Sequence, residues 1–152
     1  MERKQEALEN FMSGRNCAQS VFMAYADLLN LSAEQAAMVS AGFGGGMGRL
    51  RKTCGAFSAC VALCGYLIGE DGGDPAMRPQ VYAKVQESYR RFIDRCGSVD
   101  CAVLLKKPPI PESPFPDERT AEYYAKRPCI QIVGNACDIL DELLAEKEAA
   151  DA

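Results

Sequence analysis

The residues with the clearest chemical potential in this sequence are its cysteines. Eight occur, at positions 17, 54, 60, 64, 96, 101, 129 and 137, and the 152-residue chain contains no histidine. The lack of histidine excludes mixed Cys/His zinc sites, Rieske-type ligation, His-ligated haem and His-assisted nucleophiles. Any metal chemistry must therefore use thiolates, carboxylates or carbonyl oxygens. In a reducing compartment, cysteines in such number are more often ligands or redox groups than permanent disulfides.

Cys54 follows a glycine-rich loop, in which five of the seven residues from 42 to 48 are glycine. Such a loop allows close approach of other groups and is not expected to hold a regular element. The apolar segment that continues to Ile68 is too long and alanine-rich for a strand, and it predicts a buried helix with Cys54 in its first turn. The helix start and the upstream basic segment RLRK favour the thiolate form. The alternatives are that Cys54 is a small core residue and that RLRK is merely solvated.

Helical periodicity and capping residues predict an all-α fold. We expect helices over residues 2–12, 17–30, 32–41, 54–68, 75–96, 99–105 and 129–149, and one helical turn near 121–125. Asn16 is a good N-cap, Ser32 with Gln35 forms a capping-box pattern, and Pro75 suits a first helical position. Residues 106–128 hold six of the eight prolines and predict an irregular, surface-covering connection. The chain, 1–152, is expected to be one domain, a compact bundle of about six or seven helices.

Four cysteines share a position in these predicted helices. Cys17, Cys54, Cys101 and Cys129 each fall in the first turn of a separate helix. If the four helix starts converge, they form a pocket of thiols ringed by N–H donors, which suits several thiolates or an anionic cluster with thiolate ligands. The remaining cysteines lie in helix interiors or at a helix end and are expected to pack without a ligand: Cys60, Cys64, Cys96 and Cys137.

The order of these blocks resembles a known family. RNCAQS, then GFGGGMG leading to CGAFSAC, then CGSVDC, then PC before the last helix are similar to the redox-active family labelled C_GCAxxG_C_C. The similarity covers nearly the whole chain from about Asn16. It implies an all-helical fold and a cysteine-based site whose four members correspond to Cys17, Cys54, Cys101 and Cys129. The block after Cys54 departs at Ala59, where the family motif tends to have glycine, and this change removes no ligand.

Three chemistries are compatible with the four cysteines. An iron–sulfur cluster for electron transfer or redox sensing is the first hypothesis, because four thiolates are its usual ligands and loop N–H groups could bond its sulfurs. The glycines expected beside such a cofactor are Gly44, Gly45, Gly46 and Gly55. The alternatives are a thiol–disulfide function without metal, a structural four-thiolate zinc-binding or interaction domain, and four buried thiols with no ligand. No C-x-x-C pair occurs, so any site must be assembled by the fold. Whether the protein is an enzyme stays open, because no convincing acid/base pair is present.

Composition limits the partners and the location. The net charge of −4 and the lack of a long basic run give no reason to expect nucleic acid. The most apolar stretch, from Phe57 to Ile68, is shorter than the roughly 18 residues of a membrane span. The first residues, MERKQEALENF, lack the apolar core of an export signal, so a cytoplasmic protein is expected. A redox partner protein of unknown identity is implied, and the apolar helices are compatible with a homo-oligomer.

Overall fold

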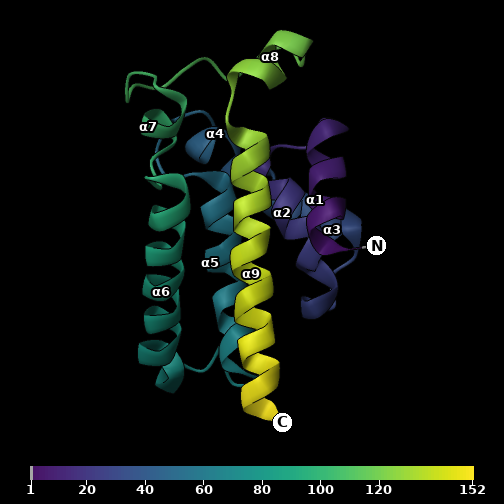
Figure 1. Cartoon of the computed structure of the whole chain (residues 1–152), viewed down its shortest axis with the longest axis vertical. Coiled ribbons are helices and arrows are strands. Elements are labelled where there is room, and N and C mark those ends of the chain that lie inside the picture. The colour runs from purple at the N-terminus through teal and green to yellow at the C-terminus, as the bar shows by residue number, and fades with distance from the viewer. Residues whose placement is uncertain (1) are drawn as a thin grey trace.

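The computed structural model describes residues 2–152, and helices form all the regular elements among them (Figure 1). The expected all-α fold is confirmed. The α-helices are α1 (Arg3–Met12), α2 (Cys17–Tyr25), α3 (Ala33–Ser40), α4 (Gly44–Met47), α5 (Gly55–Ile68), α6 (Arg78–Cys96), α7 (Cys101–Leu105), α8 (Ala121–Lys126) and α9 (Cys129–Asp151). Short 3-10 turns, η1 (Ala26–Leu29), η2 (Ala41–Phe43) and η3 (Pro75–Met77), connect some of them.

The apolar helix α5 is the centre of the bundle. It packs against α2, α6 and α9, which surround it in Figure 1. Its buried side chains include Phe57 and Leu63, and the ring of Phe57 lies 5.4 Å from that of Phe92 on α6. A helix that is apolar on nearly all sides is stable only when it is enclosed in this way. The prediction of a buried helix is therefore confirmed, but the helix begins at Gly55, so Cys54 is its N-cap and not part of its first turn.

The predicted helix starts agree well with the structure. The Asn16 side chain accepts a hydrogen bond from the backbone N–H of Gln19, and Ser32 does the same for Gln35, each in a complete capping box. The end of α2 differs from the expected single helix over 17–30. After Tyr25 the chain tightens into η1, which ends at Asn30 in a left-handed conformation. The helical segment therefore ends at residue 30, as expected, but its last turn is a 3-10 turn and not α-helix.

The last helix, α9, connects to several neighbours through polar contacts. The buried Tyr25 of α2 donates its hydroxyl to Asp141 at 2.7 Å. Lys4 of α1 pairs with Asp138 at 3.1 Å, and Arg91 of α6 pairs with glutamates of α9. These contacts fix α9 against α1, α2 and α6. The position of its first residue, Cys129, follows from them.

The glycine-rich loop is more ordered than expected. Residues 41–47 form η2 and the single helical turn α4, which is interrupted by Gly45 and Gly46 at φ 66° and 68°. These left-handed values are readily adopted by glycine because it has no Cβ. An isolated antiparallel bridge between Thr53 and Asp100 then joins the loop to the segment before α7. This bridge holds Cys54 and Cys101 close to each other.

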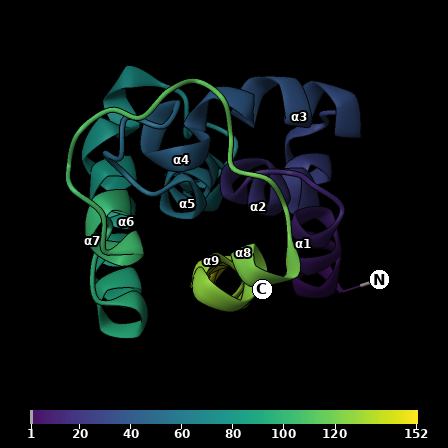
Figure 2. The same ribbon diagram turned by 90° about the horizontal axis from the view of Figure 1, so that it is seen from above.

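A proline-rich segment covers one end of the bundle. Residues 107–120, here called the strap, run from α7 across the region of α4 to α8, as the green trace in Figure 2 shows. The strap contains no regular element, as the sequence predicted, and α8 forms where one helical turn was expected. In the part of the chain from residue 2 onwards, no helix has both the length and the apolar character required to span a membrane.

Candidate functional site

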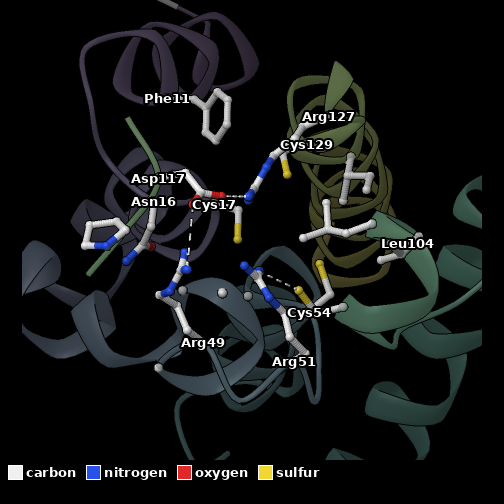
Figure 3. Close-up of a pocket in the computed structure, with 18 of the residues that line it drawn as sticks. Phe11, Asn16, Cys17, Arg49, Arg51, Cys54, Leu104, Asp117, Arg127 and Cys129 are labelled. Atoms are coloured by element: carbon white, nitrogen blue, oxygen red, sulfur yellow. Dashed lines mark hydrogen bonds and ion pairs between the residues drawn. The ribbon is translucent and has the colours of Figure 1, made fainter. Parts of the chain in front are cut away.

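A cavity of about 350 Å³ lies beneath the strap. It is bounded by the start of α2, the glycine-rich loop, α7, the strap and the start of α9. All four cysteines singled out by the sequence line it, namely Cys17, Cys54, Cys101 and Cys129. In the close-up of Figure 3, Cys17 and Cys129 extend from opposite elements toward the space that Arg51 also enters. The expected convergence of the four thiols is therefore what the structure shows, and their chemical role stays a prediction.

Each of the four thiols is positioned by the start of a helix. Cys17 is the first residue of α2, directly after its N-cap, and Cys54 is the N-cap of α5. Cys101 and Cys129 are the first residues of α7 and α9. The first turns of helices leave backbone N–H groups without intrahelical partners. The four side chains thus enter the cavity from backbone that can donate hydrogen bonds to a negatively charged sulfur.

Cys17 is the thiol most readily ionised. Contact with the Cys54 thiol, followed by backbone N–H groups that include that of Gly45, lowers the pKa of Cys17 to about 6, against the opposing effect of burial. The same contact and burial raise the pKa of Cys54 well above its ordinary value. One proton is thus shared unequally between the two neighbours. The directions of the two pKa shifts favour the thiolate form of Cys17 and the protonated form of Cys54.

The other two thiols are protonated in the absence of a ligand. Burial raises the pKa of Cys129 to about 12, and the neighbouring Cys17 adds to this effect. Burial also raises the pKa of Cys101, although Arg51 opposes it. A metal that binds these cysteines as thiolates must therefore displace protons from them.

The predicted glycines are close to the thiols, but not all face the cavity. Gly44, Gly45 and Gly55 are among the lining residues, whereas Gly46 is not. A Cβ atom added to Gly46 would lie 2.5 Å from the Cβ of Cys101, so this glycine supports Cys101 from behind. Whether these glycines contact a cofactor stays a prediction.

Four arginines line the same cavity, namely Arg49, Arg51, Arg119 and Arg127. Among its described lining residues, Asp117 provides the carboxylate. Arg51 is only 2% exposed, and its Nη1 atom lies 3.5 Å from the Sγ of Cys101. The solvated interpretation of the RLRK segment is therefore wrong for Arg51. Arg119 and Arg127 come from the proline-rich connection, and no local pattern in the sequence indicated that they return to the cysteines.

The strap is held over the cavity by these cations. Glu112 accepts from Arg51 at 2.5 Å and pairs with Arg49 at 2.7 Å and Lys107 at 2.9 Å. Arg51 and then Lys107 lower the pKa of Glu112 to about 2. Asp117 forms further ion pairs with Arg49 and Arg127, drawn as dashed lines in Figure 3.

Arg119 anchors the other end of the strap. Its guanidinium donates to the carbonyl oxygens of Phe11 and Arg15, at 3.0 and 2.9 Å, and lies 4.5 Å from the centre of the Phe11 ring. A guanidinium over an aromatic face adds a cation–π attraction to these hydrogen bonds. Polar and cation–π contacts thus attach the strap at both ends of the cavity.

The remaining cysteines lie outside the cavity lining. Cys60, Cys64 and Cys137 are buried, and Cys96 is half-buried. The Cys64 thiol donates to the carbonyl oxygen of Cys60 at 3.3 Å, one helical turn earlier. These are the contacts of packed thiols, as the sequence predicted. Throughout residues 2–152, all eight cysteines are free thiols.

The cavity offers the type of ligand that iron–sulfur clusters use. Four thiols without histidine are the usual ligands of such clusters, and the arginines would offset the negative charge of four thiolates. A structural zinc ion needs all its sulfur ligands about 2.3 Å from one point. Among the residues described, no three Cys, Asp or Glu side chains are grouped to hold a single metal ion.

Comparisons with known proteins agree with the cysteine pattern. The sequence profile described as "Putative redox-active protein (C_GCAxxG_C_C)" matches residues 15–143, a region that contains all four cavity cysteines. The chain is also 32% identical over 144 residues to a protein of Archaeoglobus fulgidus named "Uncharacterized protein", and the match covers 90% of this chain and 89% of that relative. No solved structure matches the chain.

Proposed function

This chain belongs to the C_GCAxxG_C_C family of redox-active proteins, and from that premise we propose that its four cavity cysteines hold an iron–sulfur cluster for electron transfer or redox sensing. The observation that supports this proposal is that Cys17, Cys54, Cys101 and Cys129, from four separate helices, line one cavity. A function that used only two thiols would leave the other two without a role. When bound, a cluster would supply a centre that gains and loses single electrons.

The residues of the cavity have distinct roles in this proposal. The four thiols would provide the ligands after losing their protons, and the lowered pKa of Cys17 favours this loss. Arg51 and Arg127 would offset the negative charge of the thiolates. The strap would limit the access of water, because Pro114 and Pro116 form part of the cavity wall. Fewer water molecules around the site strengthen its electrostatic interactions.

A second candidate function is thiol–disulfide exchange, favoured by the contact between Cys17 and Cys54. The Cys17 thiolate would attack one sulfur of an external disulfide, form a mixed disulfide and release the other sulfur as a thiolate. The Cys54 thiol would then lose its proton and attack the Cys17 sulfur, forming the Cys17–Cys54 disulfide and releasing the second thiol. The external disulfide is reduced by two electrons, and the two cysteines are oxidised. This reaction leaves Cys101 and Cys129 unused.

The deciding experiment is anaerobic purification followed by visible spectroscopy and assays of iron, zinc and acid-labile sulfide. We expect a coloured protein with iron and sulfide. Single replacements Cys17→Ser, Cys54→Ser, Cys101→Ser and Cys129→Ser should each reduce the iron and sulfide content. Cys64→Ser is the matched control, because Cys64 is buried but does not line the cavity.

Three results would overturn the cluster proposal. The first is full iron and sulfide content in all four cavity variants. The second is colourless protein with bound zinc, which would indicate a structural site. The third is colourless, metal-free protein in which Cys17 and Cys54 form a reversible disulfide at cytosolic potentials, which would establish the second candidate.

A further inference from the structure

Arg51 is a buried cation with an unused hydrogen-bond donor. Its side chain is 1% exposed, and its Nε atom has no hydrogen-bond partner among the described residues. Leaving a buried donor of a charged group unpaired is unfavourable. The backbone of Arg51 is also held in a left-handed conformation, at φ 58°. Such strained backbone in a non-glycine residue is typical of functional positions.

The other two nitrogen atoms of this guanidinium connect the thiol site to the strap. Nη1 donates to the Sγ of Cys101 at 3.5 Å, and Nη2 donates to Glu112 at 2.5 Å. Because the guanidinium is planar and rigid, these two contacts fix the direction of the Nε–H as well. Arg51 lines the cavity, and in Figure 3 its guanidinium extends toward the space that Cys17 also enters.

The other arginines of the cavity bind carboxylates or backbone carbonyl oxygens. Arg49 pairs with carboxylates of the strap, and Arg119 bonds to backbone carbonyls. Arg127 pairs with Asp117. Among the cavity arginines, Arg51 is the one for which the structure gives a hydrogen bond to a cavity sulfur. Its unused donor is therefore best placed to recognise a further negatively charged sulfur atom.

We propose that Arg51 donates its Nε–H to a negatively charged sulfur atom of the group held by the four cysteines and thereby raises the reduction potential of the site. This inference rests on the proposed cluster function. Reduction adds negative charge to the group, and a fixed cation in a weakly polar environment stabilises the more negative state. Hydrogen bonds to the sulfurs of a cluster act in the same direction. Arg51 is thus a positioning and tuning residue that is not itself a ligand.

The test is a redox titration of the anaerobically purified protein and of Arg51→Gln, Arg51→Lys and Glu112→Gln. Arg51→Gln removes both the charge and the Nε donor, and we expect its midpoint potential to fall by at least about 59 mV, a tenfold change for a one-electron couple. Arg51→Lys keeps the positive charge but lacks the Nε donor, so its midpoint potential should fall less than that of Arg51→Gln. Glu112→Gln is the comparison variant, because it keeps the charge of Arg51, its Nε donor and its contact with Cys101 but removes the charged partner of Nη2, and its midpoint potential should fall less than that of Arg51→Gln.

The outcomes separate this inference from the cluster proposal. If the variants bind iron and sulfide like the wild type but all four potentials agree, the role of Arg51 is refuted and the cluster stands. If Glu112→Gln lowers the potential as much as Arg51→Gln, the strap and not Arg51 controls it. If the wild type contains no iron, the cluster proposal fails, and the proposed role of Arg51 toward that group fails with it.

Discussion

Gly55 lies directly against the sulfur of Cys17: a Cβ atom at Gly55 would be 2.8 Å from that Sγ atom. It would also be 2.8 Å from the carbonyl oxygen of Phe43. No real Cβ atom tolerates these contacts, so α5 and α2 approach at this distance only because residue 55 is glycine. The spacing of the Cys17 and Cys54 thiols depends on the same approach.

Replacing Gly55 by alanine should therefore disturb both stability and the thiol pair. Alanine favours a helix over glycine, but overpacking commonly lowers the free energy of unfolding by about 1–3 kcal/mol, and we expect this effect to dominate. Urea unfolding would measure the change. Gly42→Ala is a suitable control, because an added Cβ there meets nothing within 4 Å. Equal stability of the two variants would contradict the close approach.

The attachment of the strap should weaken in acid. The pKa of Glu112 is lowered from 4.5 to about 2 in the folded chain. A carboxyl of this kind contributes stability above its unfolded pKa, and the contribution is lost as pH falls from about 4.5 toward 2. Hydrogen exchange of residues 107–120 should accordingly increase, relative to the helices, between pH 6 and pH 3. In Glu112→Gln the strap should already exchange faster at pH 6, with a smaller further increase; an identical pH response in both proteins would disagree with this account.

Cys17 should react as a thiolate at unusually low pH. In reduced, metal-free protein, we expect the rate of its alkylation to rise with pH around a midpoint near 6, because the Cys54 thiol and backbone N–H groups stabilise the anion. Cys54→Ala removes the largest of these effects and should move the midpoint upward, toward the ordinary value of 9.0. Peptide mapping by mass spectrometry identifies the alkylated residue. A wild-type midpoint near 9 would show that the pair does not share a proton as described.

Tyr25 should stabilise the fold without affecting the cavity. Its buried hydroxyl donates to Asp141 and contacts the carbonyl oxygen of Cys137, at 2.7 and 3.1 Å. Tyr25→Phe should lower the free energy of unfolding by about 1–2 kcal/mol, because a hydrogen bond to a charged group is lost. The exposed Tyr82 provides a control in Tyr82→Phe, which should leave stability unchanged. Cys17 alkylation should be the same in both variants, and a changed rate would mean that α9 transmits the loss to the cavity.

The sequence predicted those parts of the site that depend on local structure. The helix starts at Cys17 and Cys129 are marked by a capping residue and by proline, and such signals act within a few residues. The helix expected over 99–105 begins two residues later, at Cys101. The boundary at Cys54 was misplaced by one residue, because Gly55, the first residue of α5, has a weak helix preference and gives no clear signal of a helix start. That small shift changes Cys54 from a first-turn residue into an N-cap.

The parts that depend on long-range electrostatics could not be predicted. Nothing near Arg51 in the sequence indicates burial, because its partners Cys101 and Glu112 follow 50 and 61 residues later. Arg119 and Arg127 lie in a segment whose prolines reveal only that it is irregular. Its path over the cavity is set by ion pairs between distant residues. The left-handed backbone of Arg51 is likewise imposed by the folded structure, since such a conformation is unfavourable for an isolated arginine.

The placement of Cys129 has a consequence for how the protein is made. The four thiols are spread from the second helix to the start of the last one, and the final turns of the chain hold that helix in place. During synthesis, Cys17, Cys54 and Cys101 are all added to the chain before Cys129. A group that requires all four thiols therefore cannot be inserted before Cys129 has been synthesised.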